Sequence, residues 1–331
     1  MRQQFRKARW YRSMLFVPGH NLEWMLKAPK YGADALIFDL EDAVPVAQKP
    51  LARERTGKAL DALKDGTFGR FVRLNGWRTG NMVEDLLAVM RPGLDGVMLP
   101  KVEDVEDITA LDLMLGDMEM QRGLPQGHIE ILPGCETAQA LYRYYDICKC
   151  SERVRRAGGS MNAVPAGDGN RALGLIDATG ENIEERSLEN RMLLNGNAVL
   201  EARAAGVTQI LGGMCTRIDD LELVRRVAQR ARQLGASGSQ VIHPSHVKIL
   251  NEVFAPSAAE IEQARATVVA MAEAVARGEA AVRLNGRMID YAHARSGLQV
   301  LERARSVGID VGAVPALAVP SFDDPASPWS A

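Results

Sequence analysis

The chain has few aromatic residues, few cysteines and histidines, and almost no net charge. Aromatic side chains make up 5% of its 331 residues, beside 4 cysteines and 5 histidines. Its 40 basic and 42 acidic side chains give a formal net charge of −2, so it lacks the basic field that holds a nucleic-acid backbone. We therefore expect no nucleic acid among its partners.

Long apolar runs and paired cysteines are missing as well. No stretch approaches the run of about 18 apolar residues that a membrane-spanning helix needs. The segment 11–18, which follows a basic start, is broken by Arg12 and Ser13. The cysteines show no CxxC spacing, and in so long a chain they do not make a disulfide framework. We expect a cytoplasmic protein without an export signal or a membrane partner.

Hydrophobic residues make up 47% of the chain, and they occur in short runs that alternate with amphipathic stretches. Eight runs are candidate strands: 13–17, 35–39, 70–74, 96–99, 129–133, 162–166, 208–211 and 240–242. Stretches with apolar residues at helical spacing lie between them, at 49–63, 83–90, 102–120, 184–205 and 219–234. Alternating strands and helices predict a parallel sheet, and eight such units favour a closed (β/α)8 TIM barrel over residues 10–255.

The pattern changes after residue 255, and a separate extension is predicted over 256–312. Its elements are a helix, a hairpin around Asn285-Gly286 and a second helix, at 257–276, 280–284 with 287–289, and 293–306. Ser257 and Glu260 have the spacing of a capping box at the start of the first helix. The segment 313–331, rich in proline, alanine and serine from residue 315 on, is predicted to be a disordered tail.

Functional residues of such a barrel lie at the carboxyl ends of the strands, and polar residues collect there. They are Asp39, Glu41, Asp42, Asn75, Lys101, Glu103, Glu136, Asp168 and His243. Glu136 and Asp168 follow neighbouring predicted strands and could converge on one Mg²⁺, because two carboxylates completed by water and substrate oxygens suit that ion. The alternative is that each of them caps the next helix.

Three acids crowd into the segment Asp39-Leu40-Glu41-Asp42, directly after the second predicted strand. Such crowding in a cleft is costly unless cations or hydrogen-bond donors neutralise it. These acids could therefore form an outer shell around a metal. The alternative is a helix N-terminus that is enriched in acids because of its dipole.

The cationic candidates are Arg12, Arg73 and Lys101. Either arginine could receive the oxygens of an anionic substrate in bidentate fashion, and either could instead form a structural ion pair. Lys101 could form a Schiff base if burial lowered its pKa. Because Glu103 and Asp104 beside it would keep it protonated, an electrostatic role fits better.

Three further residues have chemistry in principle. His243, which precedes a proline, could be a general base, but a packed structural histidine fits better. Cys135 has no recognisable basic partner and is interpreted as a small buried residue. Asp290 becomes relevant only if the extension folds over a barrel mouth as a lid that excludes water.

Nine short motifs occur in a fixed order between Arg12 and Arg305. They are Arg12-Ser13-Met14-Leu15-Phe16-Val17-Pro18, Asp39-Leu40-Glu41-Asp42-Ala43-Val44, Lys49 with Arg53, Arg73-Leu74-Asn75, Leu99-Pro100-Lys101-Val102-Glu103, Glu136-Thr137-Ala138, Asp168 six residues before Gly174, Ile242-His243-Pro244 and Gly286-Arg287-Met288-Ile289-Asp290. In this order the motifs resemble the citrate lyase β-subunit and malyl-CoA lyase family of acyl-CoA lyases. Each motif alone is a weak signal, whereas nine in sequence are a strong one.

The resemblance implies a Mg²⁺-dependent TIM barrel that acts on a CoA thioester. Its C-terminal extension would cover the active site of a neighbouring subunit, in a homotrimer or homohexamer. The implied roles are metal ligands for Glu136 and Asp168, substrate contacts for Arg12, Arg73 and Glu136, an outer shell around the metal for Glu41 and Asp42, and catalysis for Arg73 and for Asp290 supplied by the neighbour.

The implied reaction is carbon–carbon cleavage of a 3-hydroxyacyl-CoA such as malyl-, citramalyl- or citryl-CoA, or the reverse Claisen condensation. A malyl-CoA thioesterase on the same barrel is the alternative, and a non-catalytic binding subunit is a third reading. The third reading rests on two departures from the family pattern, namely Leu211 in place of the aspartate of an Asp-Gly-Pro and Ser239 in place of a lysine. A further departure is Pro165 in place of a glycine.

Overall fold

The computed structural model describes residues 9–158 and 192–319. The strands of its main sheet are β1 Ser13–Pro18, β2 Ala35–Asp39, β3 Gly69–Arg73, β4 Gly96–Leu99, β5 Glu130–Pro133, β6 Arg156–Ala157, β7 Gln209–Gly212 and β8 Gly238–Val241. The helices around it are α1 Leu22–Lys27, α2 Lys49–Leu63, α3 Met82–Val89, α4 Val105–Arg122, α5 Ala138–Tyr142, α6 Tyr144–Lys149, α9 Met192–Ala204, α10 Leu221–Gln233 and α11 Pro244–Phe254, with 3-10 turns at Ala28–Tyr31 and Val46–Gln48.

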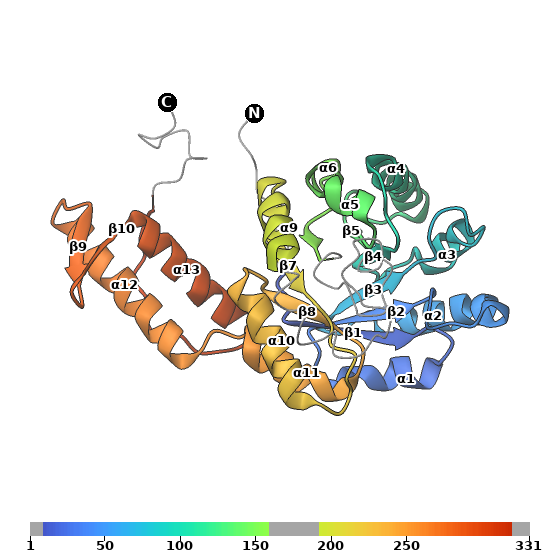
Figure 1. Ribbon diagram of the computed structural model, residues 1–331, viewed down its shortest axis with the longest axis horizontal. Coiled ribbons are helices and arrows are strands. Elements are labelled where there is room, and N and C mark those ends of the chain that lie inside the picture. The colour runs from blue at the N-terminus through green and yellow to red at the C-terminus, as the bar shows by residue number, and fades with distance from the viewer. Residues whose placement is uncertain (1–8, 159–191, 320–331) are drawn as a thin grey trace. The chain divides into compact units, whose positions relative to one another are not determined.

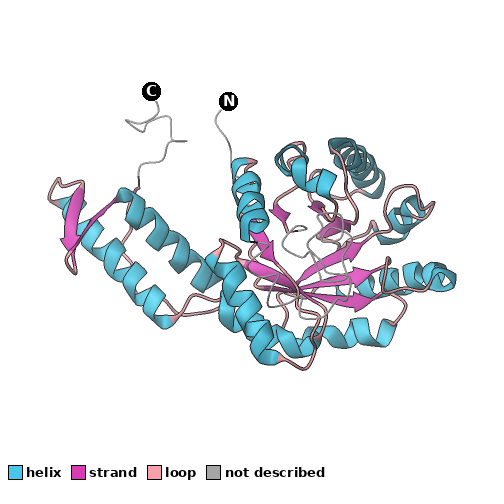
Figure 2. Cartoon of the chain, viewed as in Figure 1, coloured by secondary structure: helices cyan, strands magenta, loops and turns pink. Residues whose placement is uncertain are grey.

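The eight strands form one parallel sheet that nearly closes on itself. Their order is β5-β4-β3-β2-β1-β8-β7-β6. The two end strands approach each other, since the Ile131 N–H of β5 donates to the carbonyl of Arg153, just before β6, at 3.0 Å. The helices surround the strands (Figures 1 and 2). The predicted TIM barrel is confirmed.

The barrel core has two layers because successive side chains of a strand point to opposite faces. In β2, Leu36 and Phe38 pack in the large cluster shared with the surrounding helices. Ala35 and Ile37 join a smaller cluster whose other members come from the neighbouring strands and fill the barrel interior, among them Phe71. All five residues of β2 are buried, as expected for a parallel strand covered on both faces.

The strand in the sixth position along the chain was not among the predicted apolar runs. The strand in that position is β6, Arg156–Ala157, whereas the predicted run 162–166 lies outside the described residues. Arg156 is fully buried, and its guanidinium lies over the rings of Tyr11 and Phe71 at 4.5 and 5.1 Å. Because β6 carries a buried arginine, the apolar pattern did not predict it.

Residues from Ala255 on form a second compact unit. Its elements are α12 Ala258–Ala276, β9 Ala281–Leu284, β10 Arg287–Asp290 and α13 Tyr291–Ser306. The capping box of Ser257 and Glu260 is present, and β9 and β10 pair antiparallel around the predicted turn. Leu317 packs against the α12–α13 core, so the tail predicted from residue 315 is ordered at least this far.

None of the helices in residues 9–158 and 192–319 has the length and hydropathy that crossing a bilayer requires.

Candidate active site

Polar side chains from four neighbouring strands meet at the carboxyl end of the barrel. We call them the mouth cluster: Asp39 at the end of β2, Glu41 and Asp42 after it, Arg73 at the end of β3, Lys101 after β4 and Glu136 after β5. In a TIM barrel this is the end at which active sites are built. Sequence position predicted five of these six residues at strand ends, and Arg73 was predicted separately as a cationic candidate.

Asp39 holds Arg73 by a bidentate pair of hydrogen bonds. Nε of Arg73 donates to Oδ1 at 2.7 Å, and Nη2 donates to Oδ2 at 2.6 Å. The guanidinium also lies 4.9 Å from the ring centroid of Phe16 on β1. Although burial works against the charged form, the hydrogen bonds to Asp39 raise the pKa of Arg73 above its ordinary value. The arginine is a fixed cation in the wall of the mouth.

Glu41 is buried and is shared by two cations. Its Oε1 lies 2.9 Å from Nζ of Lys101, and its Oε2 lies 3.1 Å from Nη1 of Arg73. The contact with Arg73 lacks the geometry of a hydrogen bond, and Oε2 receives none. Burial raises the pKa of Glu41, and Arg73 partly offsets that effect. A buried carboxylate oxygen without a donor is suited to accept a cation or a water.

Lys101 reaches Glu41 from a strained backbone. Its φ is 52°, in the left-handed region that few residues other than glycine adopt. The hydrogen bond to Glu41 raises the pKa of Lys101, and Asp42 adds a contact at 3.5 Å. The prediction of a protonated lysine agrees with this direction, but its partners were wrong, because Asp104 instead caps α4. Strain of this kind clusters at functional sites.

Among the acids of the mouth cluster, Glu136 has the most strongly shifted pKa. Burial, followed by the nearby charge of Glu41, raises the pKa of Glu136 to about 7. The alternative that Glu136 caps α5 is wrong, because Thr137 is the cap and its side chain accepts from Ala140 N–H at 3.1 Å. The Glu136 carboxylate is therefore not used as a helix cap. Two crowded acids, one with an unpartnered buried oxygen, are an arrangement that a divalent cation would stabilise.

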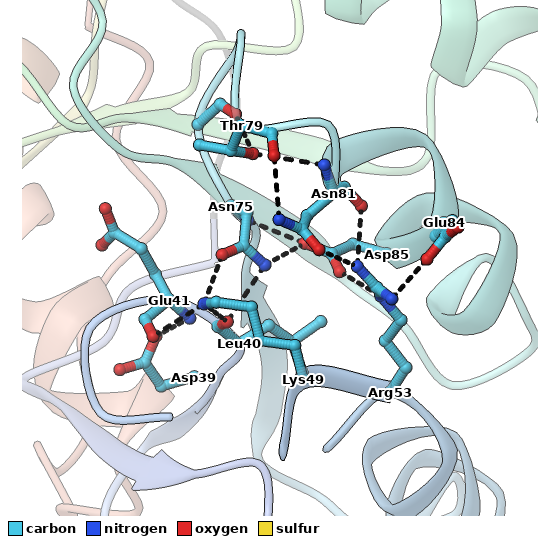
Figure 3. Close-up of polar contacts among 11 residues, drawn as sticks. Asp39, Leu40, Glu41, Lys49, Arg53, Asn75, Thr79, Asn81, Glu84 and Asp85 are labelled. Carbon is cyan, nitrogen blue, oxygen red and sulfur yellow. Dashed lines mark hydrogen bonds and ion pairs between the residues drawn. The ribbon is translucent and has the colours of Figure 1, made fainter. Parts of the chain in front are cut away.

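The segment after β2 forms no helix cap. Neither the 3-10 turn Val46–Gln48 nor α2 has an acid in its first turn, so the helix-dipole alternative for Asp39, Glu41 and Asp42 is wrong. Instead Asp39 accepts the backbone N–H groups of Glu41 and Ala43 at 2.9 and 3.0 Å. Figure 3 shows Asp39, Leu40 and Glu41 of this loop together with the neighbouring polar residues.

Arg12 lies at the other end of the barrel, which corrects the prediction that it contacts substrate. It directly precedes β1, and its Nε and Nη2 both donate to Asp34, just before β2, at 2.8 Å. The amino ends of the strands form the face of a TIM barrel that serves stability rather than catalysis. Arg12 is the structural ion pair that was the alternative.

Two predicted site residues are not part of the described mouth. Asp168 lies outside the described residues. Asp290 belongs to the C-terminal unit, where it caps α13 and accepts from Ala292 N–H at 2.9 Å. His293 lies 2.7 Å from its Oδ1, and this hydrogen bond lowers the pKa of Asp290. Within residues 9–158 and 192–319, no three His, Cys, Asp or Glu side chains form a metal cluster by themselves.

The structure also describes the other residues that the sequence singled out. Nδ1 of His243, the residue before α11, lies 2.7 Å from the hydroxyl of Ser245 in the first turn of that helix. Burial raises the pKa of the Cys135 thiol well above its ordinary value, so this cysteine is a poor nucleophile. Leu211 is buried in the barrel interior, and buried Ser239 donates to the carbonyl of Gly212 at 3.1 Å. These two departures from the family pattern lie inside β7 and β8, which corrects the expectation that they touch the barrel mouth.

Two contributors to the site were missed. Phe16 lies under the Arg73 guanidinium, and its place in the Leu-Phe-Val-Pro run at the end of β1 was the available signal. Asp85 is fully buried below the mouth cluster and receives two hydrogen bonds from Asn75. Because Asp85 lies within the helix α3, no local pattern marks it.

The sequence matches one protein family over most of its length. The profile described as HpcH/HpaI aldolase/citrate lyase matches residues 12–244. Citrate lyase subunit beta from Leuconostoc mesenteroides subsp. cremoris is 32% identical over 281 residues, which cover 84% of this chain and 88% of that protein. A (3S)-malyl-CoA thioesterase from Cereibacter sphaeroides is 30% identical over 303 residues, which cover 90% and 95%.

Solved structures share the fold. A CitE protein from Mycobacterium tuberculosis, in complex with magnesium, acetoacetate and coenzyme A, superposes with a TM-score of 0.60 at 26% identity and covers 91% of this chain and 99% of that one. A citrate lyase from Burkholderia xenovorans LB400 gives a TM-score of 0.73 at 22% identity, with coverage of 93% and 94%. At that identity the second match supports the fold alone.

Proposed function

From the premise that the chain belongs to the HpcH/HpaI aldolase/citrate lyase family, we propose that it is a Mg²⁺-dependent carbon–carbon lyase. Its substrate would be a 3-hydroxyacyl-CoA such as malyl-, citramalyl- or citryl-CoA, cleaved into an acyl-CoA and a 2-oxo acid. The same site would catalyse the reverse condensation. The observation that carries this proposal is the mouth cluster, in which crowded carboxylates face two fixed cations.

The acids of the mouth fit a magnesium ion. Glu136 would be a ligand, since its raised pKa reflects burial and negative neighbours that a cation would relieve. Glu41, with its buried Oε2 free of any hydrogen bond, and Asp42 would hold water around the ion. Asp168 would be the second carboxylate ligand. Mg²⁺ bound there would polarise the substrate oxygen that becomes the carbonyl of the 2-oxo acid.

Arg73 would stabilise the enolate oxygen of the departing thioester. Two of its nitrogens are engaged by Asp39, which leaves Nη1 as the one that faces the mouth beside Glu41. Because the guanidinium is already oriented, it would stabilise developing negative charge without having to reorganise.

Asp290 would move the proton at the α-carbon of the acyl-CoA. Its lowered pKa makes it a carboxylate at neutral pH, so it would accept that proton in the condensation direction and return it during cleavage. Since Asp290 belongs to the C-terminal unit, we propose that it acts on a neighbouring subunit of a homotrimer or homohexamer. The unit would then also exclude water from the enolate.

Product analysis tests the reaction. The purified protein would be incubated with Mg²⁺ and a panel of hydroxyacyl-CoA thioesters, and products identified by mass spectrometry. We expect an acyl-CoA and a 2-oxo acid from one member of the panel, and no turnover with EDTA or in Glu136→Gln. Glu103→Gln, an exposed glutamate after β4, is the matched control and should retain turnover. Metal-dependent turnover that survives in Glu136→Gln would refute the proposed metal site.

A thioesterase is the second candidate, because the 30% identity to a (3S)-malyl-CoA thioesterase nearly equals that to citrate lyase subunit beta. On this alternative a water would attack the thioester carbonyl beside Arg73. The products distinguish the two, since a thioesterase releases free CoA and a hydroxy acid and forms no 2-oxo acid.

A further inference from the structure

Lys49, the first residue of α2, lies directly below the acidic loop of the mouth cluster. Its Nζ donates to the backbone carbonyls of Leu40 and Glu41 at 2.8 and 3.1 Å, and to Oδ1 of Asn75 at 2.5 Å (Figure 3). All three acceptors are neutral. Within the part of the chain that the structure describes, Lys49 forms no ion pair, so its charge is not neutralised by a carboxylate in contact with it.

The uncompensated ammonium matters because the mouth cluster has more acids than bases. Its carboxylates are Asp39, Glu41, Asp42 and Glu136, and its cations are Arg73 and Lys101. A positive charge held under the backbone of this segment reduces the repulsion among these acids. Because the ammonium bonds neutral oxygens and no carboxylate, it leaves the carboxylates of the mouth cluster to their other partners.

Asn75 is locked in the orientation that Lys49 requires. Its Nδ2 donates to the carbonyl of Leu40 at 3.0 Å and to Asp85 at 2.6 Å, so its Oδ1 must face the lysine. Asp85 in turn accepts from Nε of Arg53 at 2.7 Å, and Arg53 also donates to Asn81 at 2.6 Å. The acceptor for Lys49 is therefore set by a buried chain of polar contacts.

Glu41 is thus held at both ends of its backbone. Asp39 accepts its N–H at 2.9 Å, and Lys49 donates to its carbonyl. With the backbone fixed in this way, the Glu41 carboxylate emerges between Lys101 and Arg73. We infer that Lys49 is a positioning residue that fixes the Glu41 carboxylate in the mouth cluster. This inference rests on the proposed function only for its effect on metal binding and turnover.

Replacement of Lys49 separates positioning from folding. Lys49→Met keeps the length of the side chain and removes the charge and the donors, Lys49→Arg restores both, and Lys58→Met changes an exposed lysine on the same helix. The measurements are Mn²⁺ affinity by electron paramagnetic resonance, with Mn²⁺ as the probe of the magnesium site, and kcat and KM for the thioester. Thermal unfolding monitors the fold.

We expect Lys49→Met to lower both kcat and Mn²⁺ affinity about tenfold, the scale for outer residues that orient metal ligands. KM should change less than kcat because Lys49 would not touch the substrate. Lys49→Arg should recover part of the loss, and Lys58→Met should match the wild type. A folded Lys49→Met with unchanged kcat and Mn²⁺ affinity would overturn the inference. A loss confined to the unfolding temperature would also overturn it.

A crystal structure of Lys49→Met without metal provides a readout that does not depend on the proposed reaction. We expect the Glu41 carboxylate to leave Lys101, with loss of the 2.9 Å contact. An unchanged contact would refute positioning even if activity fell. A wild-type protein that neither binds Mn²⁺ nor converts any thioester would instead refute the proposed function, whereas displacement of Glu41 would still support positioning. If Lys49→Met does not fold, Lys49→Gln takes its place in each of these measurements.

Discussion

Asp39 and Arg73 are register partners on β2 and β3, and two parallel hydrogen bonds join their side chains at the carboxyl end of the barrel. The ladder that pairs the two strands therefore also aligns the fork of the guanidinium with the carboxylate. Since Nε and Nη2 are both used, the plane of the guanidinium is fixed and Nη1 is directed to one place beside Glu41. A compact ammonium could neutralise Asp39 but could not reproduce this plane.

We accordingly predict that Arg73→Lys lowers kcat about 100-fold, the scale for removal of one oriented donor from an oxyanion site. The unfolding temperature should change little, because a lysine can still pair with Asp39. Steady-state kinetics and thermal unfolding would be compared with Arg91→Lys, which alters an arginine after α3 that pairs with Asp61 on α2. A kcat within threefold of the wild type would show that the planar fork is not needed for the reaction.

Glu136 should make the metal-free protein less stable at alkaline pH. Its pKa is raised to about 7 in the folded state, from an ordinary value of 4.5. Between these values the folded protein retains a proton that the unfolded chain has released, so the free energy of unfolding falls as the pH rises through this window. Above pH 7 the loss of unfolding free energy is complete, because the buried Glu136 carboxylate is then ionised beside Glu41.

Glu136→Gln should therefore be more stable than the wild type at pH 8 in EDTA, by on the order of 1 to 3 kcal/mol, and nearly equal to it at pH 4.5. Denaturant unfolding at both pH values measures this difference. Added Mg²⁺ should raise the stability of the wild type and leave that of the variant unchanged. Equal stabilities of the two proteins at pH 8 would mean that the fold does not raise the pKa of Glu136. Glu103→Gln controls for the loss of a surface charge.

Asp290 has a structural role and a proposed chemical one, and two substitutions separate them. Its Oδ1 caps α13 by accepting from Ala292 N–H, a bond that an asparagine amide oxygen can also accept. Asp290→Asn should thus keep the unfolding temperature of the C-terminal unit and lose turnover, because an amide cannot take the proton. Asp290→Ala should lose turnover and also about 1 kcal/mol of unfolding free energy through the missing cap.

Kinetics and calorimetry on the full chain would measure both effects. Ser257→Ala, which removes the cap of α12, is the matched control: it should lose stability to a similar extent and keep turnover. If Asp290→Asn were as active as the wild type, the proton transfer would belong to another group.

Local signals predicted the elements that local interactions determine. The capping box of Ser257 and the hairpin at Asn285-Gly286 depend on residues only a few positions apart, and both are present. Partners that are distant in sequence were not predictable in this way. Lys101 pairs with Glu41, 60 positions earlier, rather than with its neighbour Glu103.

The two arginines show why a strand-end residue is hard to assign from sequence. Arg12 and Arg73 both border an apolar run, but Arg12 precedes its strand whereas Arg73 ends one. The end of an apolar run that lies at the active site depends on the direction of the strand in the closed barrel. The ion pair of Arg12 with Asp34 forms only when β1 and β2 pair. The apolar run 13–17 therefore predicted β1 correctly, whereas the role predicted for Arg12 was wrong.

Gly134 permits the close approach of the segments after β4 and β5, and it offers a test of how strictly the position of Glu136 is set. Its N–H donates to the carbonyl of Leu99 at 2.8 Å, and its own carbonyl accepts from Val102 N–H at 3.0 Å. A methyl group at Gly134 would lie 3.0 Å from the Leu99 carbonyl oxygen and 3.3 Å from Oε1 of Glu136. Both contacts are tighter than side chains normally make, and the first is with backbone that cannot rotate away.

Gly134→Ala should therefore push the β4 and β5 segments apart and move the Glu136 carboxylate. We expect Mg²⁺ affinity and kcat to fall about tenfold, as they do when a ligand is displaced through its supporting contacts, with a smaller loss of stability. Gly116→Ala, in the middle of α4 with only Arg153 within 4 Å, is the matched control and should be slightly more stable than the wild type, because alanine favours a helix over glycine. Isothermal titration with Mg²⁺ and steady-state kinetics measure the effect. A wild-type Mg²⁺ affinity in Gly134→Ala would mean that the position of Glu136 is not critical for binding, and that other ligands hold the ion in the mouth cluster.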